Sequence, residues 1–223
     1  MDLRLKNGSI IQVVGPSGSG KTFFVYNLIE NRNNVFRNNV HAIHWFHGTS
    51  KEVGATNNYF GKSIKKYITS HINGLQDLNT IKLTRYDMIV LDDLFIEASN
   101  NSEVTNLFTK TARHNDVTLI YITQNMFHTG SSNRTRNLNV HYLVLFKNPR
   151  DSLAIEQISR QMYSSGDVEG RQFLIQAFRD ATQNKPHGYL FFDFTQECPD
   201  YLRIRTNLFP TRDENGPYVY KQV

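Results

Sequence analysis

The sequence predicts an α/β fold in which a central, mainly parallel sheet is flanked by helices. Three apolar runs of strand length support this prediction, and each has a distinctive carboxyl end. The run at 10–14 is followed by a glycine-rich loop and then by apolar residues at helical spacing in 23–30. The run at 88–91 ends in two acids, and the run at 117–122 ends in Thr-Gln-Asn. Because ligands bind at the carboxyl ends of parallel strands, these tips define the expected site.

The glycine-rich loop has the pattern G-x-x-x-x-G-K-[ST] of a phosphate-binding P-loop. Its glycines allow backbone N–H groups to turn toward phosphate oxygens, and the following helix adds partial positive charge. We expect Lys21 to reach the β- and γ-phosphates and Thr22 to place its hydroxyl on Mg²⁺, so ATP and Mg²⁺ are the expected ligands. The residues assigned to nucleotide binding are Gly15, Pro16, Ser17, Gly18, Ser19, Gly20, Lys21 and Thr22.

The two acids that end the second run are typical of a Walker B strand. Four apolar residues, 88–91, precede Asp92 and Asp93, as in a strand buried within a parallel sheet. We assign Asp92 to Mg²⁺ and Asp93 to the attacking water. The alternative is a strand that acids merely cap.

The third run places a polar side chain, Gln124, at a strand tip where it can sense the γ-phosphate. This requires the strand to lie beside the P-loop strand, inserted between it and the strand of Asp92. That order defines a P-loop NTPase of the RecA-like ASCE type, in which an acid beside the metal aspartate acts on water.

The remaining pattern fits one domain, residues 1–223, with its core in about 8–209. Residues 210–223 read as a mobile tail. Asp151 or Ser152 is a candidate helix cap. The last elements form a C-terminal edge-strand extension of the sheet. Beyond the three runs, we expect strands at 40–46, 141–146, 189–194 and 201–209, and helices at 103–114, 152–162 and 167–182.

Composition favours a polyanionic partner. The net charge is +5 and the pI is about 9.3. Nucleic acid fits better than a membrane because the chain has no long apolar run, lipidation motif or signal-peptide core. Cys198 is the only cysteine, which excludes an intrachain disulfide and favours a reducing compartment.

Two stretches leave alternatives open. In 48–85, lysines such as Lys62, Lys65 and Lys66 are interleaved with aromatic residues, as in a nucleic-acid contact or in a solvated helix face over aromatic packing. His41, His44 and His47 could bind a metal, but no Cys, Asp or Glu accompanies them at ligand spacing, which favours ordinary strand and loop positions.

Together these motifs resemble the viral DNA-packaging ATPases of the FtsK–HerA superfamily, most closely the type of poxviruses and polinton-like viruses. The resemblance covers roughly 8–209 and implies a homo-oligomeric ring that threads double-stranded viral DNA into a preformed capsid. It also implies a capsid or vertex protein as partner and a location at virion assembly sites in the host cytoplasm or nucleus, with possible association with the virion. The residues that carry it are the P-loop, Leu91-Asp92-Asp93, Arg113, Thr123-Gln124-Asn125 and Lys147-Asn148-Pro149-Arg150-Asp151.

The resemblance further implies an arginine that reaches the nucleotide of a neighbouring subunit and neutralises charge in the transition state. Arg113 is the first candidate by its position before the Gln124 strand, with Arg134, Arg136 and Arg150 as alternatives. Many members of the superfamily carry Glu where this chain has Asp93, which is one methylene shorter. Glu97 is the alternative for that role.

Three other functions remain open at this stage. A nucleoside kinase would need an acceptor pocket and an arginine-bearing lid, which residues near Arg134 and Arg136 could supply. A nucleotide-gated binding protein would hydrolyse little ATP, and a helicase-type ATPase would share most of the motifs. The acids and Gln124 favour water as the phosphoryl acceptor.

Overall fold

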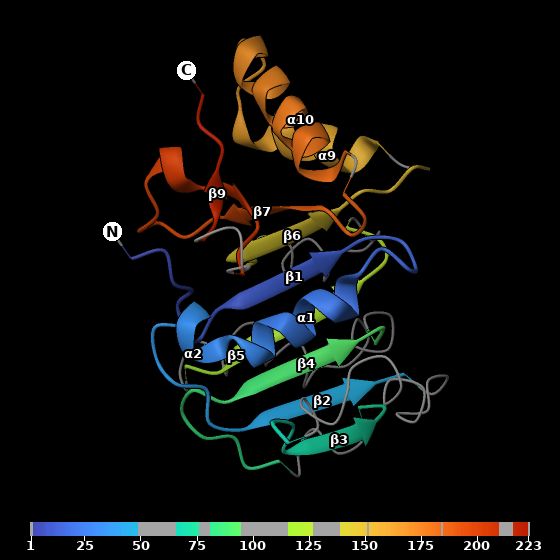
Figure 1. Cartoon of the computed structure of the whole chain (residues 1–223), viewed down its shortest axis with the longest axis vertical. Coiled ribbons are helices and arrows are strands. Elements are labelled where there is room, and N and C mark those ends of the chain that lie inside the picture. The colour runs from blue at the N-terminus through green and yellow to red at the C-terminus, as the bar shows by residue number, and fades with distance from the viewer. Residues whose placement is uncertain are drawn as a thin grey trace.

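Within the residues that the computed structural model describes, nine strands form one sheet (Figure 1). The described residues are 2–48, 66–75, 81–94, 116–126, 139–150, 152–183, 185–209 and 216–222. The strands are β1 (Ile10–Val14), β2 (Ile43–His47), β3 (Ser70–Asn73), β4 (Met88–Asp92), β5 (Thr118–Thr123), β6 (Tyr142–Phe146), β7 (Tyr189–Asp193), β8 (Ile204–Thr206) and β9 (Tyr218–Val219).

The order of the strands is β3-β2-β4-β5-β1-β6-β7-β8-β9. The first six strands in this order, from β3 through β1 to β6, are parallel to one another. β7, β8 and β9 each pair antiparallel with the strand before them in the order. β5 separates β1 from β4, with Val14 of β1 opposite Thr123 of β5. This confirms the expected sheet, with the Gln124 strand inserted between the P-loop strand and the Walker B strand.

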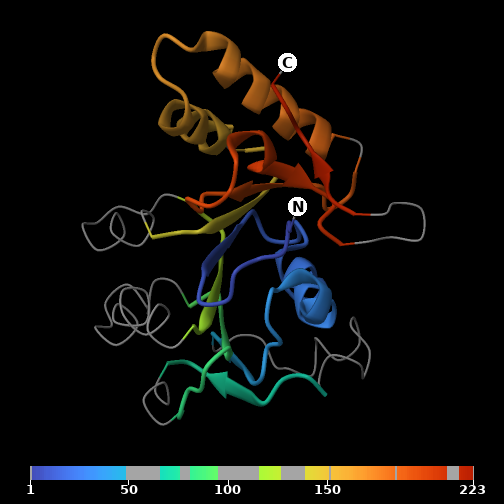
Figure 2. The ribbon, with the colours of Figure 1, turned by 90° about the vertical axis from the view of Figure 1, so that its left-hand side faces the viewer.

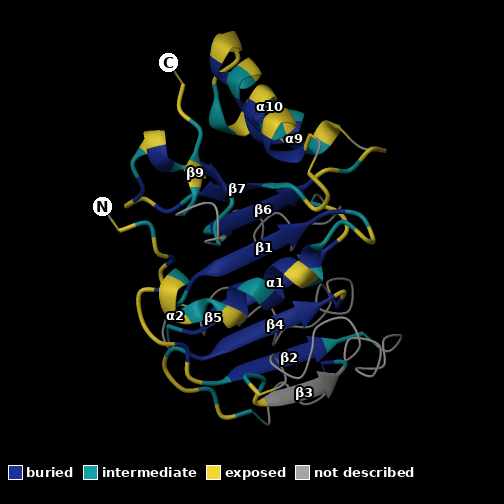
Figure 3. Ribbon diagram, viewed as in Figure 1, coloured by how far each residue is buried: buried dark blue, intermediate teal, exposed yellow. Residues whose placement is uncertain are grey.

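Helices cover both faces of the sheet. On one face, α1 packs against apolar side chains of β1, β4 and β5, and on the other face α9 and α10 pack against alternate residues of the same sheet (Figure 2). Burial on both faces explains why the central strands read as continuous apolar runs, and Figure 3 shows them buried throughout. The described helices are α1 (Lys21–Glu30), α2 (Arg32–Val35), α9 (Leu153–Met162), α10 (Val168–Thr182) and the 3-10 turn η3 (Asp200–Leu202).

The caps of the two C-terminal helices differ. Asp167 caps α10, since its Oδ1 accepts a hydrogen bond from the Gly170 N–H at 2.8 Å. Ser152 occupies the cap position of α9, but its side chain makes no capping hydrogen bond, and Asp151 lies outside the described residues. The predicted capping bond of Ser152 is therefore absent. The helix predicted at 103–114 also lies outside the described residues.

Residues before and after the expected core, 8–209, also pack or pair with the sheet region. Leu5, before residue 8, is buried and bridges to Phe36. Tyr218–Val219, within the predicted tail, pair with β8. The hydroxyl of Tyr220 donates to Asp180 at 2.6 Å and ties this segment to α10. The strand predicted at 201–209 shortens to β8 because η3 precedes it, and β9 rather than β8 ends the sheet.

A buried ion pair holds the antiparallel extension together. Arg205 is 2% exposed and its Nη2 donates to Asp193 Oδ2 at 2.6 Å. Its remaining donors contact the carbonyls of Leu202 and Leu3, so the guanidinium joins β7, β8 and the N-terminal segment. Because removing one partner leaves a buried charge without its counter-ion, this pair is a strong determinant of stability.

Asp193→Asn should lower the free energy of unfolding by about 3 kcal/mol, because Arg205 keeps its charge and loses its buried counter-ion. The measurement is urea unfolding followed by circular dichroism. Asp2→Asn, in the exposed pair with Arg4, should cost less than about 1 kcal/mol. Equal effects of the two substitutions would show that the buried pair carries no special stability.

Candidate nucleotide-binding site

The P-loop follows β1 and leads into α1, and its backbone requires glycine at three positions. Gly18 and Gly20 have φ of 78° and 104°, which side-chain-bearing residues rarely adopt. Gly15 packs against β6, where an added Cβ would lie 2.7 Å from the Cβ of Phe146. The loop is therefore held close to the neighbouring strand as well as to its own helix.

Lys21 opens α1 and lies across the loop. Its side chain is buried, and Nζ donates to the carbonyls of Gly15 at 2.6 Å and Pro16 at 2.9 Å. Thr22 follows in the first turn of the helix, where N–H groups point outward and favour an anion. Lys21 and Thr22 thus lie together at the amino end of α1, directly after the loop.

A backbone hydrogen bond joins the P-loop to the tip of β5. The N–H of Gly15 donates to the carbonyl of Thr123 at 3.2 Å, immediately before Gln124. The hydroxyl of Thr123 donates in turn to the carbonyl of Asn125 at 3.0 Å, which shapes the turn after the strand. The tip of β5 is thus in direct contact with the first glycine of the loop.

The acids at the end of β4 have different environments. Asp92 is buried as the last residue of the strand, opposite Ile122 of β5. Asp93 is exposed and has φ of 55°. Aspartate tolerates this left-handed conformation better than most residues, and strained backbone of this kind is concentrated at functional sites. The bend turns the chain sharply at the end of β4.

These groups line one cavity of about 540 Å³ at the carboxyl edge of the sheet. Lys21, Thr22, Asp92, Asp93 and Gln124, five residues predicted from sequence, meet there. Gly15, Pro16 and Ser19 of the P-loop do not line it, and Gly15 is instead buried against β6. The lining residues are Ser17, Gly18, Gly20, Lys21, Thr22, Phe23, Asp92, Asp93, Gln124 and His187.

The donor set fits Mg²⁺. Thr22 offers a hydroxyl oxygen and Asp92 a carboxylate oxygen, both on the same cavity. Among the described residues, no three His, Cys, Asp or Glu side chains gather as a metal-ligand set. Mg²⁺ at nucleotide sites needs only one or two protein oxygens, since water and phosphate supply the others. Thr22 and Asp92 are therefore the residues that would hold it.

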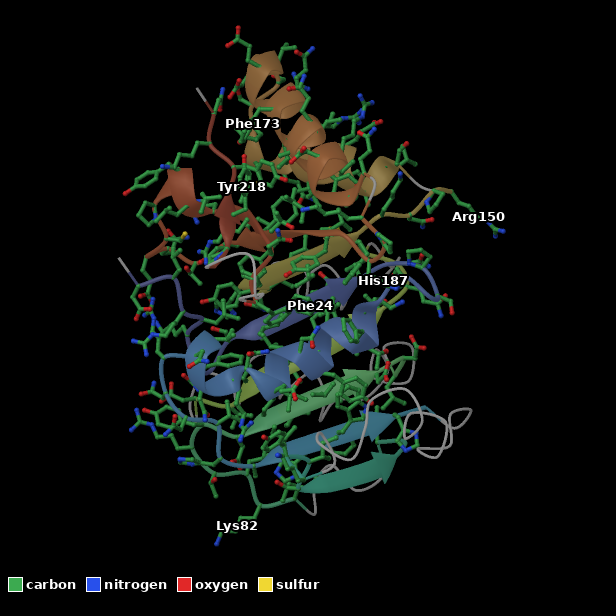
Figure 4. The ribbon with its side chains drawn as sticks, in the orientation of Figure 1. Phe24, Lys82, Arg150, Phe173, His187 and Tyr218 are labelled. Carbon is green, nitrogen blue, oxygen red and sulfur yellow. The ribbon has the colours of Figure 1, made fainter. Side chains whose placement is uncertain are left out.

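The arginine candidates are placed unequally. Arg113, Arg134 and Arg136 lie outside the described residues, as does the alternative acid Glu97. Arg150 follows β6 at the same edge of the sheet, is exposed, and points away from the molecule (Figure 4). It does not line the cavity of its own chain.

Two of the three histidines near β2, His44 and His41, have defined surroundings. His44 is buried, and burial lowers the pKa of its imidazole while the nearby Asp87 carboxylate opposes that shift. The ring of His41 packs edge-on against Tyr86, with 5.9 Å between centroids.

Sequence reasoning missed two residues of the cavity wall, Phe23 and His187. Phe23 was treated only as the first residue of the helical segment 23–30, and 47% of it is exposed. His187 lies in a Pro-His-Gly turn, a pattern that predicts a change of chain direction and not a contact. Its place beside the P-loop follows from the tertiary fold alone.

No protein-family model and no curated protein matches this chain. Among solved structures, it is similar to B204, the DNA-packaging ATPase of Sulfolobus turreted icosahedral virus, with a TM-score of 0.52 and 12% identity over 98% of this chain and 100% of that one. B204 of Sulfolobus turreted icosahedral virus 2 with AMPPCP gives a TM-score of 0.49, 12% identity and full coverage of both chains. FlaH of Methanocaldococcus jannaschii gives 0.43 and 14% identity over 66% of this chain and 76% of that one. At 12% identity the first likeness shows the fold, that of a RecA-like P-loop ATPase.

Gly15→Ala should lower nucleotide affinity about tenfold or more and destabilise the chain by about 1–3 kcal/mol, because the new methyl group overlaps Phe146 and forces the loop away from β6. Isothermal titration with ATP and thermal unfolding measure the two effects. Gly166→Ala is the matched control, since an added Cβ meets nothing within 4 Å there. Unchanged affinity in Gly15→Ala would contradict the tight approach of loop and strand.

Proposed function

We propose that this chain is an ATPase that moves DNA, and that it packages a viral genome into a preformed capsid as an oligomeric ring. One observation carries the proposal: a single cavity brings together Lys21 after β1, Asp93 after β4 and Gln124 after β5. A phosphate anchor, an acid and an amide on neighbouring strand tips are the groups that hydrolysis of a γ-phosphate uses.

In this proposal, Lys21 and the N–H groups of the P-loop hold the β- and γ-phosphates. Asp93 orients the attacking water and takes its proton, and Gln124 contacts the γ-phosphate. Mg²⁺ held by Thr22 and Asp92 would neutralise charge on the phosphates. The Asp92–Asp93 pair and Gln124, all on the cavity, favour water as the acceptor over the alcohol of a second substrate.

Coupling to DNA is proposed to run through the tip of β5. Loss of the γ-phosphate would release Gln124, which is linked through Thr123 to the P-loop and is followed by the segment 127–137. That segment and 48–66 follow the carboxyl ends of β5 and β2 and lie almost wholly outside the described residues. We assign both to DNA contact on the basis of their basic residues and the net charge of +5.

The ring and the trans-acting arginine belong to the same proposal. Arg113 remains the first candidate from its position in the sequence. Arg150 is supported by its exposed position at the edge of the sheet that holds the cavity, because such a side chain can reach a neighbouring subunit. We further propose that the chain belongs to the FtsK–HerA superfamily, to its poxvirus or polinton-like type. Its proposed place of action is the site of virion assembly in the host cell.

The similarity to B204 supports a packaging role, since that protein is described as a DNA-packaging ATPase. Among the described residues, apolar helices of membrane-spanning length are absent.

The proposal rests on two observations. The cavity supports ATP hydrolysis, and the similarity to B204 supports the use of that hydrolysis for DNA packaging.

Phosphate release measured with ATP, Mg²⁺ and no nucleoside acceptor should rise when double-stranded DNA is added, and the stimulation should fall as salt is raised. Lys21→Ala should abolish turnover because the phosphates lose their anchor. Turnover that requires an added nucleoside would instead identify a phosphotransferase, and DNA-stimulated hydrolysis that survives Lys21→Ala would remove the assignment of the P-loop.

Asp93→Asn should keep nucleotide affinity within about threefold and lower turnover by about 10²–10⁴, because the amide cannot accept the proton of water. Asp200→Asn makes the same chemical change at a carboxylate whose side chain is 94% exposed and should leave turnover unchanged. Normal turnover in Asp93→Asn would exclude Asp93 as the catalytic acid.

A further inference from the structure

A turn late in the sequence forms one wall of the nucleotide cavity. This wall lies on the side away from Asp92 and Asp93. The turn connects α10 to β7, and His187 is its residue on the cavity (Figure 4). Asp92, Asp93 and Gln124 come from β4 and β5, on one side of β1, whereas β7 lies on the other side, beyond β6. The cavity therefore has two chemically different ends.

The imidazole of His187 is bonded to the P-loop itself. Its Nδ1 lies 3.0 Å from the carbonyl oxygen of Ser19. A carbonyl only accepts, so Nδ1 carries the hydrogen in this contact. In the neutral ring, Nε2 is then an acceptor, and the group it suits is a hydrogen-bond donor.

The ring also packs closely against the loop at Gly20. A Cβ added at Gly20 would lie 2.9 Å from the Cβ, Cγ and Nδ1 of His187. The ring thus occupies the space that a side chain at Gly20 would take, beside the residue that caps α1. It is the tertiary contact that covers the loop from the β7 side.

Neighbouring residues fix the turn. An added Cβ at Gly188 would lie 3.0 Å from the Cα of Thr182, so the turn is pressed against the end of α10. Tyr189, which follows, packs edge-on against Phe24 of α1, with 4.9 Å between ring centroids. Since Phe24 follows the P-loop closely in sequence, this contact links the helix after the loop to the strand after the turn.

The polarity of a bound nucleotide follows from these positions. Asp93 and Gln124 place the γ-phosphate at the β4–β5 end, so the nucleoside must extend toward the opposite end. His187, on the turn before β7, lines the cavity on that side. The imidazole of His187, bonded to the loop through Nδ1, thus lies on the side where the ribose and base are expected.

We propose that His187 binds the nucleoside part of the nucleotide, with Nε2 accepting a hydrogen bond from a donor group, either a ribose hydroxyl or the exocyclic amino group of adenine. This inference rests on the proposed ATP binding and adds the residue that recognises the nucleoside. His187 is accordingly a specificity-determining residue and takes no part in phosphoryl transfer.

The test uses His187→Asn in the full chain, since asparagine tolerates φ of 64° and its amide can still donate to Ser19. Binding of ATP, 2′-deoxy-ATP, ITP and inorganic tripolyphosphate is measured by competition with a fluorescent ADP. The variant should bind ATP about five- to tenfold more weakly, as expected for one lost hydrogen bond, and should bind tripolyphosphate as the wild type does.

The analogues identify the donor group. If wild type and variant bind 2′-deoxy-ATP equally weakly, the donor is the 2′-hydroxyl of the ribose. If wild type and variant bind ITP equally weakly, the donor is the adenine amino group. His41→Asn, at an exposed histidine at the opposite edge of the sheet, is the matched control and should bind every ligand normally.

Two results would overturn the inference. Unchanged ATP affinity in His187→Asn would show that the ring does not contact the nucleotide. Equal weakening of ATP and tripolyphosphate would show that His187 only supports the P-loop. Failure of the wild type to bind ATP would instead contradict the proposed function, so the two failures are distinguishable.

Discussion

The parallel pairing of β1 with β5 is the constraint on which the site depends. It sets Val14 opposite Thr123 and lets the N–H of Gly15 bond to the carbonyl of Thr123, so the P-loop and Gln124 begin at the same level of the sheet. With strands about 4.8 Å apart, β4 then lies about 10 Å from β1. That separation leaves room for a γ-phosphate and a water between Lys21 and the acids.

The antiparallel extension supports the loop from the other side. Tyr189 of β7 and Phe209 pack against Phe24, with 4.9 Å and 5.2 Å between ring centroids, and so hold α1 against the sheet. The Arg205–Asp193 pair ties β7 to β8 at the other end of β7. The extension therefore does more than end the sheet, because it positions the helix that follows the P-loop and carries the turn of His187. A disturbance there can reach the nucleotide cavity without any change in the P-loop motif.

The sequence predicts the centre of the sheet well because buried parallel strands leave clear apolar runs, and the tips of β1, β4 and β5 carry motifs with a chemical purpose. It predicts the periphery poorly. Arg205 was expected on an edge strand. The alternation of apolar and charged residues along a strand does not distinguish a buried, paired arginine from an exposed one. β9 is two residues long and gives no periodic signal. His187 meets Gly20 only through the fold, and a turn motif describes the backbone and not what its side chain touches.

The central claim is that this cavity holds a triphosphate with its γ-phosphate between Lys21, Asp93 and Gln124. A structure of the full chain with Mg²⁺ and a non-hydrolysable ATP analogue tests it most directly. We predict the γ-phosphate within hydrogen-bond reach of Lys21 and Gln124, with a water between it and Asp93 and the nucleoside beside His187. A triphosphate in the opposite direction, or one bound away from the ends of β4 and β5, would contradict the account.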